Sequence, residues 1–198
     1  MDFELPKDLV EYLAELDRFI EAEIRPLENE NDNIRFFDHR REYERTDWAR
    51  GGLPKKEWEE LLAEARRRAD RAGHLRFAWP AELGGRNGSQ LWLAVIREHL
   101  AAKGLGLHND LQNEHSIVAN NPFVVMFKEF ATPEQYARDH EKLLKDEMIT
   151  AFGLTEPEHG SDATHMDTRA VPQERDGRKG WLINGAKYFA TNGTGWER

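Results

Sequence analysis

Uncharged hydroxyl side chains gather in one short stretch, where the chain turns at a proline and a glycine. The stretch AFGLTEPEHGSDATHMDTRA occupies 151–170 and carries Thr155, Ser161, Thr164 and Thr168. A hydroxyl donates or accepts a hydrogen bond without carrying charge. Gly160 lets the backbone approach a ligand closely, and backbone N–H groups beside a serine suit the oxygens of a pyrophosphate. Neutral donors also suit the N5, O2 and O4 atoms of a flavin, whose ring gains charge on reduction.

A second stretch, WLINGAKYFATN at 181–192, could supply the opposite wall of such a site. Phe189 offers a flat apolar surface, and Thr191 adds another uncharged donor. Ser, Thr and Gly also dominate ordinary turns for purely local reasons. On residue types alone, a turn without a ligand is therefore the simpler interpretation, and both remain open.

The composition limits the class of protein. The chain has 198 residues, a net charge of -9, 39% hydrophobic residues and no cysteine. Its acidity argues against binding nucleic acid or an anionic membrane, because phosphates are held by Lys and Arg. Without cysteine there is no disulfide, no thiolate catalysis and no sulfur-ligated metal. The start MDFELPKDLVEYL has no basic region before an apolar run, and no apolar stretch is long enough to span a bilayer. We expect a soluble protein of the cytoplasm, a reducing compartment.

The first predicted helix covers 7–27, where apolar side chains recur at steps of three and four. This stripe comprises Leu9, Leu13, Leu16, Ile20, Ile24 and Leu27. We expect Pro26 to close the helix. The segment 28–52 that follows is rich in charge of both signs, and its aromatic residues are Phe36, Phe37, Tyr43 and Trp48. It either packs these rings on a neighbouring element or forms a solvated, partly mobile loop.

Further helices are marked by the residues at their ends. Pro54 suits the first turn of a second helix, and Gly73 suits the position just after its end. The buried stripe of that helix comprises Trp58, Leu61, Leu62, Ala65 and Ala69. Ser89 can cap a third helix that runs to residue 100 and includes Leu91, Val95 and Ile96. Thr132 and Gln135 form a capping box that opens a fourth.

From Met148 the pattern changes to that of strands. The run MITAFGLT at 148–155 is typical of a strand, and Asn184–Gly185 is a hairpin-turn signal. The sequence therefore predicts an α+β chain, with a helical domain over 1–147 and an incomplete β domain over 148–198. One hairpin and one strand bury too little surface to be stable alone. We expect either a fragment or a chain whose missing parts come from elsewhere.

Ionisable side chains in two places have spacings that could suggest a metal site. Glu156, His159, Asp162 and His165 recur every three residues, but a proline and a glycine interrupt the helix that this spacing would need. The stretch LHNDLQNEHS at 107–116 contains His108, Asp110, Glu114 and His115. A polar helix or loop surface explains the second group better, and we predict no metal site.

The motifs in this order resemble the flavin signature of the acyl-CoA dehydrogenases. The matching residues are LTEPEHGSDATHMDTRA followed by WLINGAKYFATNG, and HLRFAWPAELGG at 74–85 resembles the family's segment from helix to loop. The order and lengths of the predicted helices also match. The resemblance implies an all-α N-terminal domain followed by the beginning of an antiparallel β-barrel domain. It also implies that the family's C-terminal helical bundle is absent from this sequence.

The resemblance further implies FAD as cofactor and an acyl-CoA thioester as substrate, with hydride transfer to flavin N5. The positions implied for the cofactor are Phe152, Leu154, Thr155, Gly160, Ser161, Phe189, Ala190 and Thr191. Leu154 would contact the ring through its backbone and Thr155 through its hydroxyl. Ser161 would reach the FAD pyrophosphate and lie beside the CoA arm of the substrate. Phe189 replaces the family's usual Trp over one ring face, and Thr191 would bond N5.

Members of this family remove the substrate α-proton with a carboxylate of the C-terminal bundle. Glu156 and Asp162 are expected to be structural, so no catalytic base is assigned here, and we expect the chain alone to be inactive. The full-length family members are homo-oligomers, and an electron-accepting flavoprotein is a possible partner. Two alternatives remain: a non-catalytic helical assembly module without flavin, or a relative of acyl-CoA oxidases and flavin monooxygenases on the same scaffold.

Overall fold

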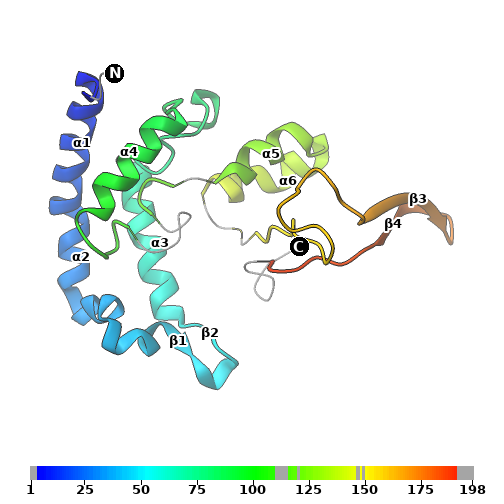
Figure 1. Cartoon of the computed structure of the whole chain (residues 1–198), viewed down its shortest axis with the longest axis horizontal. Coiled ribbons are helices and arrows are strands. Elements are labelled where there is room, and N and C mark those ends of the chain that lie inside the picture. The colour runs from blue at the N-terminus through cyan, green and yellow to red at the C-terminus, as the bar shows by residue number, and fades with distance from the viewer. Residues whose placement is uncertain (1–3, 110–115, 120, 146–147, 149, 191–198) are drawn as a thin grey trace. The chain divides into compact units, whose positions relative to one another are not determined.

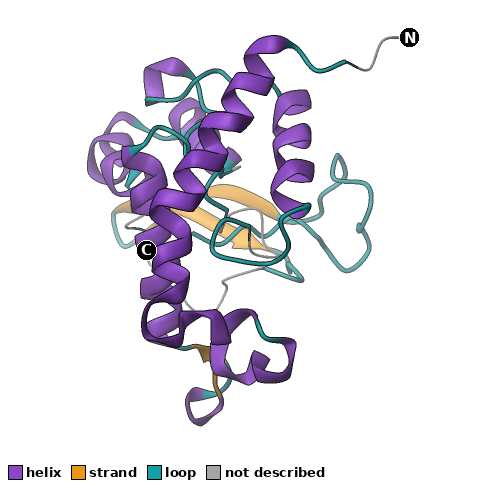
Figure 2. Cartoon of the chain, turned by 90° about the vertical axis from the view of Figure 1, so that its left-hand side faces the viewer, coloured by secondary structure: helices purple, strands orange, loops and turns teal. Residues whose placement is uncertain are grey.

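The computed structural model describes residues 4–109, 116–119, 121–145, 148 and 150–190. Contacts within the chain separate two units, Met1–Leu144 and Lys145–Arg198. The first unit is helical, and the second contains an antiparallel hairpin (Figure 1). Figure 2 distinguishes the helices, in purple, from the strands, in orange.

The N-terminal helix is longer than predicted and contains a wider turn. It comprises α1 (Lys7–Phe19), a π-helical turn (Ile20–Ile24) and α2 (Arg25–Asn29). The whole predicted apolar stripe is buried. The prediction that Pro26 closes the helix is wrong, because Pro26 lies in the first turn of α2, where a missing N–H costs little. In the turn before it, the Arg25 N–H bonds to the Ile20 carbonyl, so the helix widens and continues.

The segment after α2 forms short elements that pack only part of its aromatic residues. It comprises 3₁₀ turns (Glu30–Phe37, His39–Arg45 and Trp48–Arg50) and the antiparallel pair β1 (Thr46–Asp47) and β2 (Leu53–Pro54). Phe36 is buried against Trp58, with ring centroids 5.1 Å apart, and Phe37 is half-buried on the same indole. Tyr43 and Trp48 are exposed. Packing on a neighbour is thus confirmed for Phe36 and Phe37 and is wrong for Tyr43 and Trp48.

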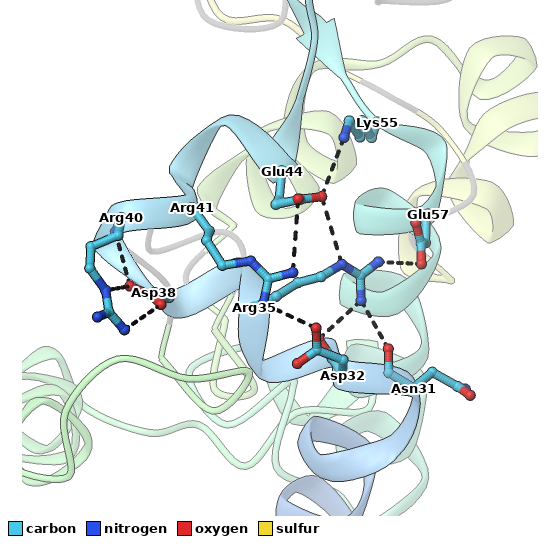
Figure 3. Close-up of polar contacts among 9 residues, drawn as sticks. All are labelled: Asn31, Asp32, Arg35, Asp38, Arg40, Arg41, Glu44, Lys55 and Glu57. Atoms are coloured by element: carbon cyan, nitrogen blue, oxygen red, sulfur yellow. Dashed lines mark hydrogen bonds and ion pairs between the residues drawn. The ribbon is translucent and has the colours of Figure 1, made fainter.

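Ion pairs hold this segment where its apolar contacts are few (Figure 3). Arg35, with a side chain only 11% exposed, pairs with Glu57 and lies 3.8 Å from Glu44. Glu44 also pairs with Lys55 at 3.5 Å and Arg41 at 3.9 Å. A single exposed ion pair contributes little, whereas a shared network around a mostly buried guanidinium restricts several side chains together.

The helices α3 (Lys56–Arg71) and α4 (Gln90–Ala101) follow the predicted end signals with one exception. Pro54 lies in β2 opposite Thr46 and not in α3, because an edge strand also tolerates a missing N–H. Gly73 has the expected left-handed φ of 78° just after α3. The Ser89 hydroxyl accepts the Trp92 N–H at 3.1 Å, which confirms the cap of α4. Leu91 is 73% exposed and is not part of the core.

The loop between α3 and α4 folds back on itself. It contains a 3₁₀ turn (Ala81–Leu83), and the N–H groups of Asn87 and Gly88 donate to the carbonyls of Trp79 and Phe77, both at 2.9 Å. Trp79 is buried with Leu83 and Val124. The segment that resembles the family's helix-to-loop motif is therefore an ordered, closely packed turn.

The last two helices of this unit, α5 (Pro122–Phe130) and α6 (Pro133–Leu144), contact each other. The capping box of α6 is confirmed: the Thr132 N–H donates to Gln135 Oε1 at 2.9 Å, and the Gln135 N–H donates to Thr132 Oγ1 at 3.3 Å. The helix α5 was not predicted from the sequence. Its stretch PFVVMFKEF is apolar on most sides and therefore shows little periodicity.

A buried carboxylate, that of Glu28, lies beside the core formed by α1, α3 and α4. Glu28 is 1% exposed, and its carboxylate accepts the Leu107 N–H and an Arg25 N–H, both at 2.7 Å. His108 is fully buried, with Nδ1 3.6 Å from the same carboxylate and Nε2 3.1 Å from the Gly104 carbonyl. The interpretation of His108 as part of a polar surface is therefore wrong. Asp110, Glu114 and His115 lie outside the described residues.

The second unit is built on the hairpin of β3 (Arg169–Arg175) and β4 (Arg178–Asn184). Its turn is Asp176–Gly177, with φ of 53° and 70°, the left-handed pair that a tight hairpin requires. The prediction of a turn at Asn184–Gly185 is wrong, because Asn184 ends β4 opposite Arg169. Every residue of both strands is exposed.

The predicted strand at 148–155 does not form as a regular strand. Within the described part of 150–158, only Phe152 is a bridge residue. The sheets seen in the described residues are two-stranded, and no closed barrel is seen there. Among the same residues, no helix is both long enough and apolar enough to cross a membrane.

Candidate functional site

Glu156 connects three segments of the second unit. The residue is 3% exposed, and its carboxylate accepts the backbone N–H groups of Asp167 at 2.5 Å and Thr168 at 3.1 Å. The same carboxylate accepts the Lys187 ammonium at 2.7 Å. It thereby connects the segment around residue 156 with the residues just before β3 and with the segment after β4. The expectation of a structural role for Glu156 fits these contacts.

Lys187 completes this junction, a role that was not predicted from the sequence. Besides Glu156, its ammonium donates to the Leu154 carbonyl at 3.1 Å and approaches Met166 Sδ at 3.5 Å. Gly153 lies against the aliphatic part of the lysine, where an added Cβ would be 3.4 Å from Lys187 Cβ. An ammonium group has three N–H donors, and all three are engaged here. Lys187 is therefore a fixed cation.

A backbone hydrogen bond brings two of the predicted ligand-binding segments together. The Tyr188 N–H donates to the Thr155 carbonyl at 2.8 Å. Phe152, Leu154 and Thr155 therefore run beside the segment that holds Phe189 and Ala190. Large apolar side chains stay open to solvent: Phe152 is 55% exposed, Leu154 37% and Phe189 87%. Thr191 lies outside the described residues.

Phe189 has an unusual backbone conformation. Its φ is 55°, in the left-handed region that a bulky residue rarely adopts. Its ring contacts that of Tyr188 edge-on, with centroids 6.2 Å apart. Such outliers persist where surrounding contacts hold them, and they are common at ligand sites.

The bend at 156–168 is held by its own polar contacts. Glu156 and His159 exchange backbone hydrogen bonds of 3.2 Å, and His159 pairs with Asp167 at 3.1 Å. Asp162 accepts the Thr164 N–H and hydroxyl and pairs with His165 at 2.7 Å. Among the described residues there is no group of three or more His, Cys, Asp or Glu that could hold a metal ion.

The predicted Gly160 and Ser161 lie in the exposed part of this bend. An added Cβ at Gly160 would meet no atom within 4 Å. The structure therefore leaves open space around the corner. It brings the segment of Phe152, Leu154 and Thr155 beside that of Phe189 and Ala190, whereas Gly160 and Ser161 lie in the exposed bend.

The electrostatics of the site follow from the Glu156 contacts. Lys187 first, and then the hydrogen bonds from Thr168 and the Asp167 N–H, lower the pKa of Glu156 from its ordinary 4.5 to about 2, against the opposing effect of burial. The carboxylate is therefore ionised at physiological pH and is matched by the lysine. Phe152, Leu154 and Phe189 are exposed side chains that carry no charge themselves.

The pH dependence of this junction is a first test. A depressed folded-state pKa means that the contribution of Glu156 is complete above about pH 4.5 and is lost as the pH falls towards 2. We expect Glu156→Gln to increase amide hydrogen exchange at Asp167 and Thr168 at neutral pH. The difference from the unsubstituted protein should shrink between pH 4.5 and 2. A difference that is the same at every pH would contradict this assignment.

With this geometry established, comparison with known proteins places the chain. Residues 151–196 match the family model for the acyl-CoA dehydrogenase middle domain. Glutaryl-CoA dehydrogenase of Desulfococcus multivorans is 27% identical over 194 residues, which is 97% of this chain and 42% of that protein. Mouse (Mus musculus) mitochondrial long-chain specific acyl-CoA dehydrogenase is 29% identical over 153 residues, covering 75% and 30% of the two chains.

The fold agrees with these matches. The solved structure of a candidate acyl-CoA dehydrogenase from Mycobacterium abscessus superposes with a TM-score of 0.63 at 25% identity, covering 96% of this chain and 44% of that one. The class is thus the mixed helix-and-sheet fold of these dehydrogenases. The chain belongs to the acyl-CoA dehydrogenase family. It spans less than half the length of the curated relatives named above.

Proposed function

We propose that this chain contributes the helical domain and part of the flavin site of an FAD-dependent acyl-CoA dehydrogenase. The observation that carries the proposal is the junction of Glu156 and Lys187. It sets the Thr155 and Phe189 segments side by side and leaves uncharged, apolar side chains facing outward. When bound, FAD would supply the acceptor for a hydride from the acyl β-carbon, giving the α,β-unsaturated thioester.

The residues present fit an isoalloxazine ring. Leu154 and Phe189 offer exposed apolar surface, and the Thr155 hydroxyl is an uncharged donor. The carboxylate of Glu156 is neutralised and buried, so it would not repel a reduced, negatively charged ring. Ala190 and Thr191 are proposed to extend this surface towards N5.

The bend at 156–168 is proposed to hold the phosphates. Gly160 and Ser161 would supply a backbone N–H and a hydroxyl to the FAD pyrophosphate, with Ser161 also beside the CoA arm. No residue of this chain is proposed as the catalytic base. That carboxylate, like the oligomer contacts and the contact with an electron-accepting flavoprotein, is assigned to other parts of the whole protein. We also propose that the helical domain ends at residue 147 and that the β domain begins at residue 148.

Flavin content tests this proposal directly. We expect the whole protein, as its gene encodes it, to purify with a visible flavin absorption band and to release FAD on denaturation. Acyl-CoA substrates should bleach the flavin absorption band. When an artificial electron acceptor is added, the protein should convert the substrate repeatedly. A folded, helical and colourless protein that takes up no added FAD would refute the proposal and favour an assembly role. Rapid reoxidation of the reduced flavin by O₂ would indicate an oxidase instead.

A further inference from the structure

We propose that Glu156 and Lys187 act as a positioning pair, which holds Phe189 in its left-handed backbone conformation so that its ring is presented to the flavin. The flavin-facing role of the ring rests on the proposed function above. The claim that the pair sets the conformation of Phe189 stands on the contacts of this chain. Neither member of the pair is proposed to touch reacting atoms.

The contacts place the pair immediately beside the strained residue. Lys187 precedes Phe189 by two positions, and its ammonium is tied to Glu156 at 2.7 Å and to the Leu154 carbonyl at 3.1 Å. The intervening Tyr188 N–H is tied to the Thr155 carbonyl. Glu156 is in turn fixed by the N–H groups of Asp167 and Thr168. The chain that enters Phe189 is thus held from two sides.

Burial of the ring does not explain the backbone strain. Phe189 is 87% exposed at a φ of 55°, so the described part of the chain gives the ring little packing in return. A bulky residue that is free to relax would leave the left-handed region. The conformation therefore depends on the anchored segment before it, which is how strained backbones persist at ligand sites.

The donors of Lys187 also argue against a direct ligand role. Its three N–H donors face Glu156, Leu154 and Met166, which leaves none for a phosphate. The paired charges cancel beside an apolar surface. An arrangement of this kind organises a site without adding net charge to it.

The test uses two substitutions and two matched controls in the whole protein. Glu156→Gln removes the charge with little change of shape, and Lys187→Met keeps the aliphatic stem. Glu174→Gln and Lys179→Met are the controls, because these residues face each other across β3 and β4 and are exposed. Helical circular dichroism checks that every variant folds. If one variant of the pair does not fold, the other carries the test.

The first measurement is amide hydrogen exchange in the protein without FAD. We expect each pair variant to raise amide hydrogen exchange at Thr168 and Tyr188 at least about ten-fold, equivalent to about 1.4 kcal/mol. Selective labelling of Phe189 should show its backbone coupling and chemical shift leaving the left-handed region. The controls should change neither. Unchanged exchange and an unchanged Phe189 backbone in both pair variants would overturn the proposal, whatever the flavin does.

The second readout is the dissociation constant for FAD, measured at a temperature where every variant remains folded. A positioning role predicts at least ten-fold weaker binding and an altered flavin spectrum in both pair variants. Faster exchange with unchanged flavin affinity would reduce the pair to a structural contact and overturn its positioning role. If the unsubstituted protein binds no FAD, the proposed function fails, while the Phe189 backbone measurement still decides the role of the pair.

Discussion

Gly85→Ala is expected to leave the helical unit unstable at physiological temperature. An added Cβ would lie 2.0 Å from the Trp79 carbonyl oxygen and 2.4 Å from its carbonyl carbon. Both are backbone atoms, and the same oxygen accepts the Asn87 N–H at 2.9 Å. Trp79 itself is only 4% exposed and packs with Leu83 and Val124. Relief therefore requires opening the folded-back loop and lifting a buried indole out of its contacts.

The size of the effect follows from overpacking. Added methyl groups in well-packed sites cost about 1–3 kcal/mol, and more where backbone must move. We expect at least about 3 kcal/mol here and a fall in Tm of roughly 10 °C, measured by thermal unfolding with circular dichroism. Gly180→Ala is the control, because a Cβ there meets nothing within 4 Å. A Tm for Gly85→Ala equal to that of the control would show that the loop adjusts freely.

Glu28→Ala is the second substitution expected to have a large effect. It leaves the buried Leu107 N–H without its acceptor and the fully buried His108 without the neighbouring carboxylate. Leaving buried donors such as the Leu107 N–H without their acceptor costs about 1–3 kcal/mol for each group, and more where the lost acceptor is charged. Urea unfolding at neutral pH would measure this loss. Glu23→Ala is the matched control, with a side chain 52% exposed and an ion pair of 3.7 Å to Arg68.

The loss of stability caused by Glu28→Ala should depend on pH in a defined direction. Burial raises the pKa of Glu28, but the nearby His108 ring and the hydrogen bonds from Arg25 and the Leu107 N–H outweigh it and lower the pKa below its ordinary 4.5. The contribution of Glu28 is therefore present above that pH and is lost as the pH falls through the lower folded-state value. The difference in the free energy of unfolding between the variant and the unsubstituted protein should therefore become smaller in acid. A gap that widened in acid would mean that Glu28 is protonated in the folded protein.

Local signals in the sequence predicted the helices where each signal had a single meaning. The stripe from Leu9 to Leu27 is buried as expected, and the caps at Ser89 and Thr132 form as predicted. Pro26 and Pro54 differ from the predictions because a proline is compatible with a helix start, an edge strand or a helix end. Asn184–Gly185 and Asp176–Gly177 give the same kind of hairpin-turn signal in the sequence. Only the pairing of β3 with β4 shows that the turn lies at Asp176–Gly177.

Only part of the site could be predicted from the sequence, because some of its features depend on contacts that form when the chain folds. Hydroxyls, glycine and an exposed aromatic side chain are visible in the sequence as groups that suit a ligand. The junction of Glu156 with Lys187 is not, because the two residues are far apart in the sequence and meet only after β3 and β4 have paired. The left-handed backbone of Phe189 is a tertiary effect that no residue preference for Phe would suggest.

The β3–β4 hairpin has a practical consequence for handling this polypeptide. One face carries Pro172, Trp181 and Ile183, the other carries Val171 and Leu182, and all of them are open to water. Each strand also has an outer edge with free backbone donors and acceptors, a template on which another strand can add. A solution of the isolated 198-residue chain should therefore become turbid at high concentration through β-rich self-association, while its helices remain folded.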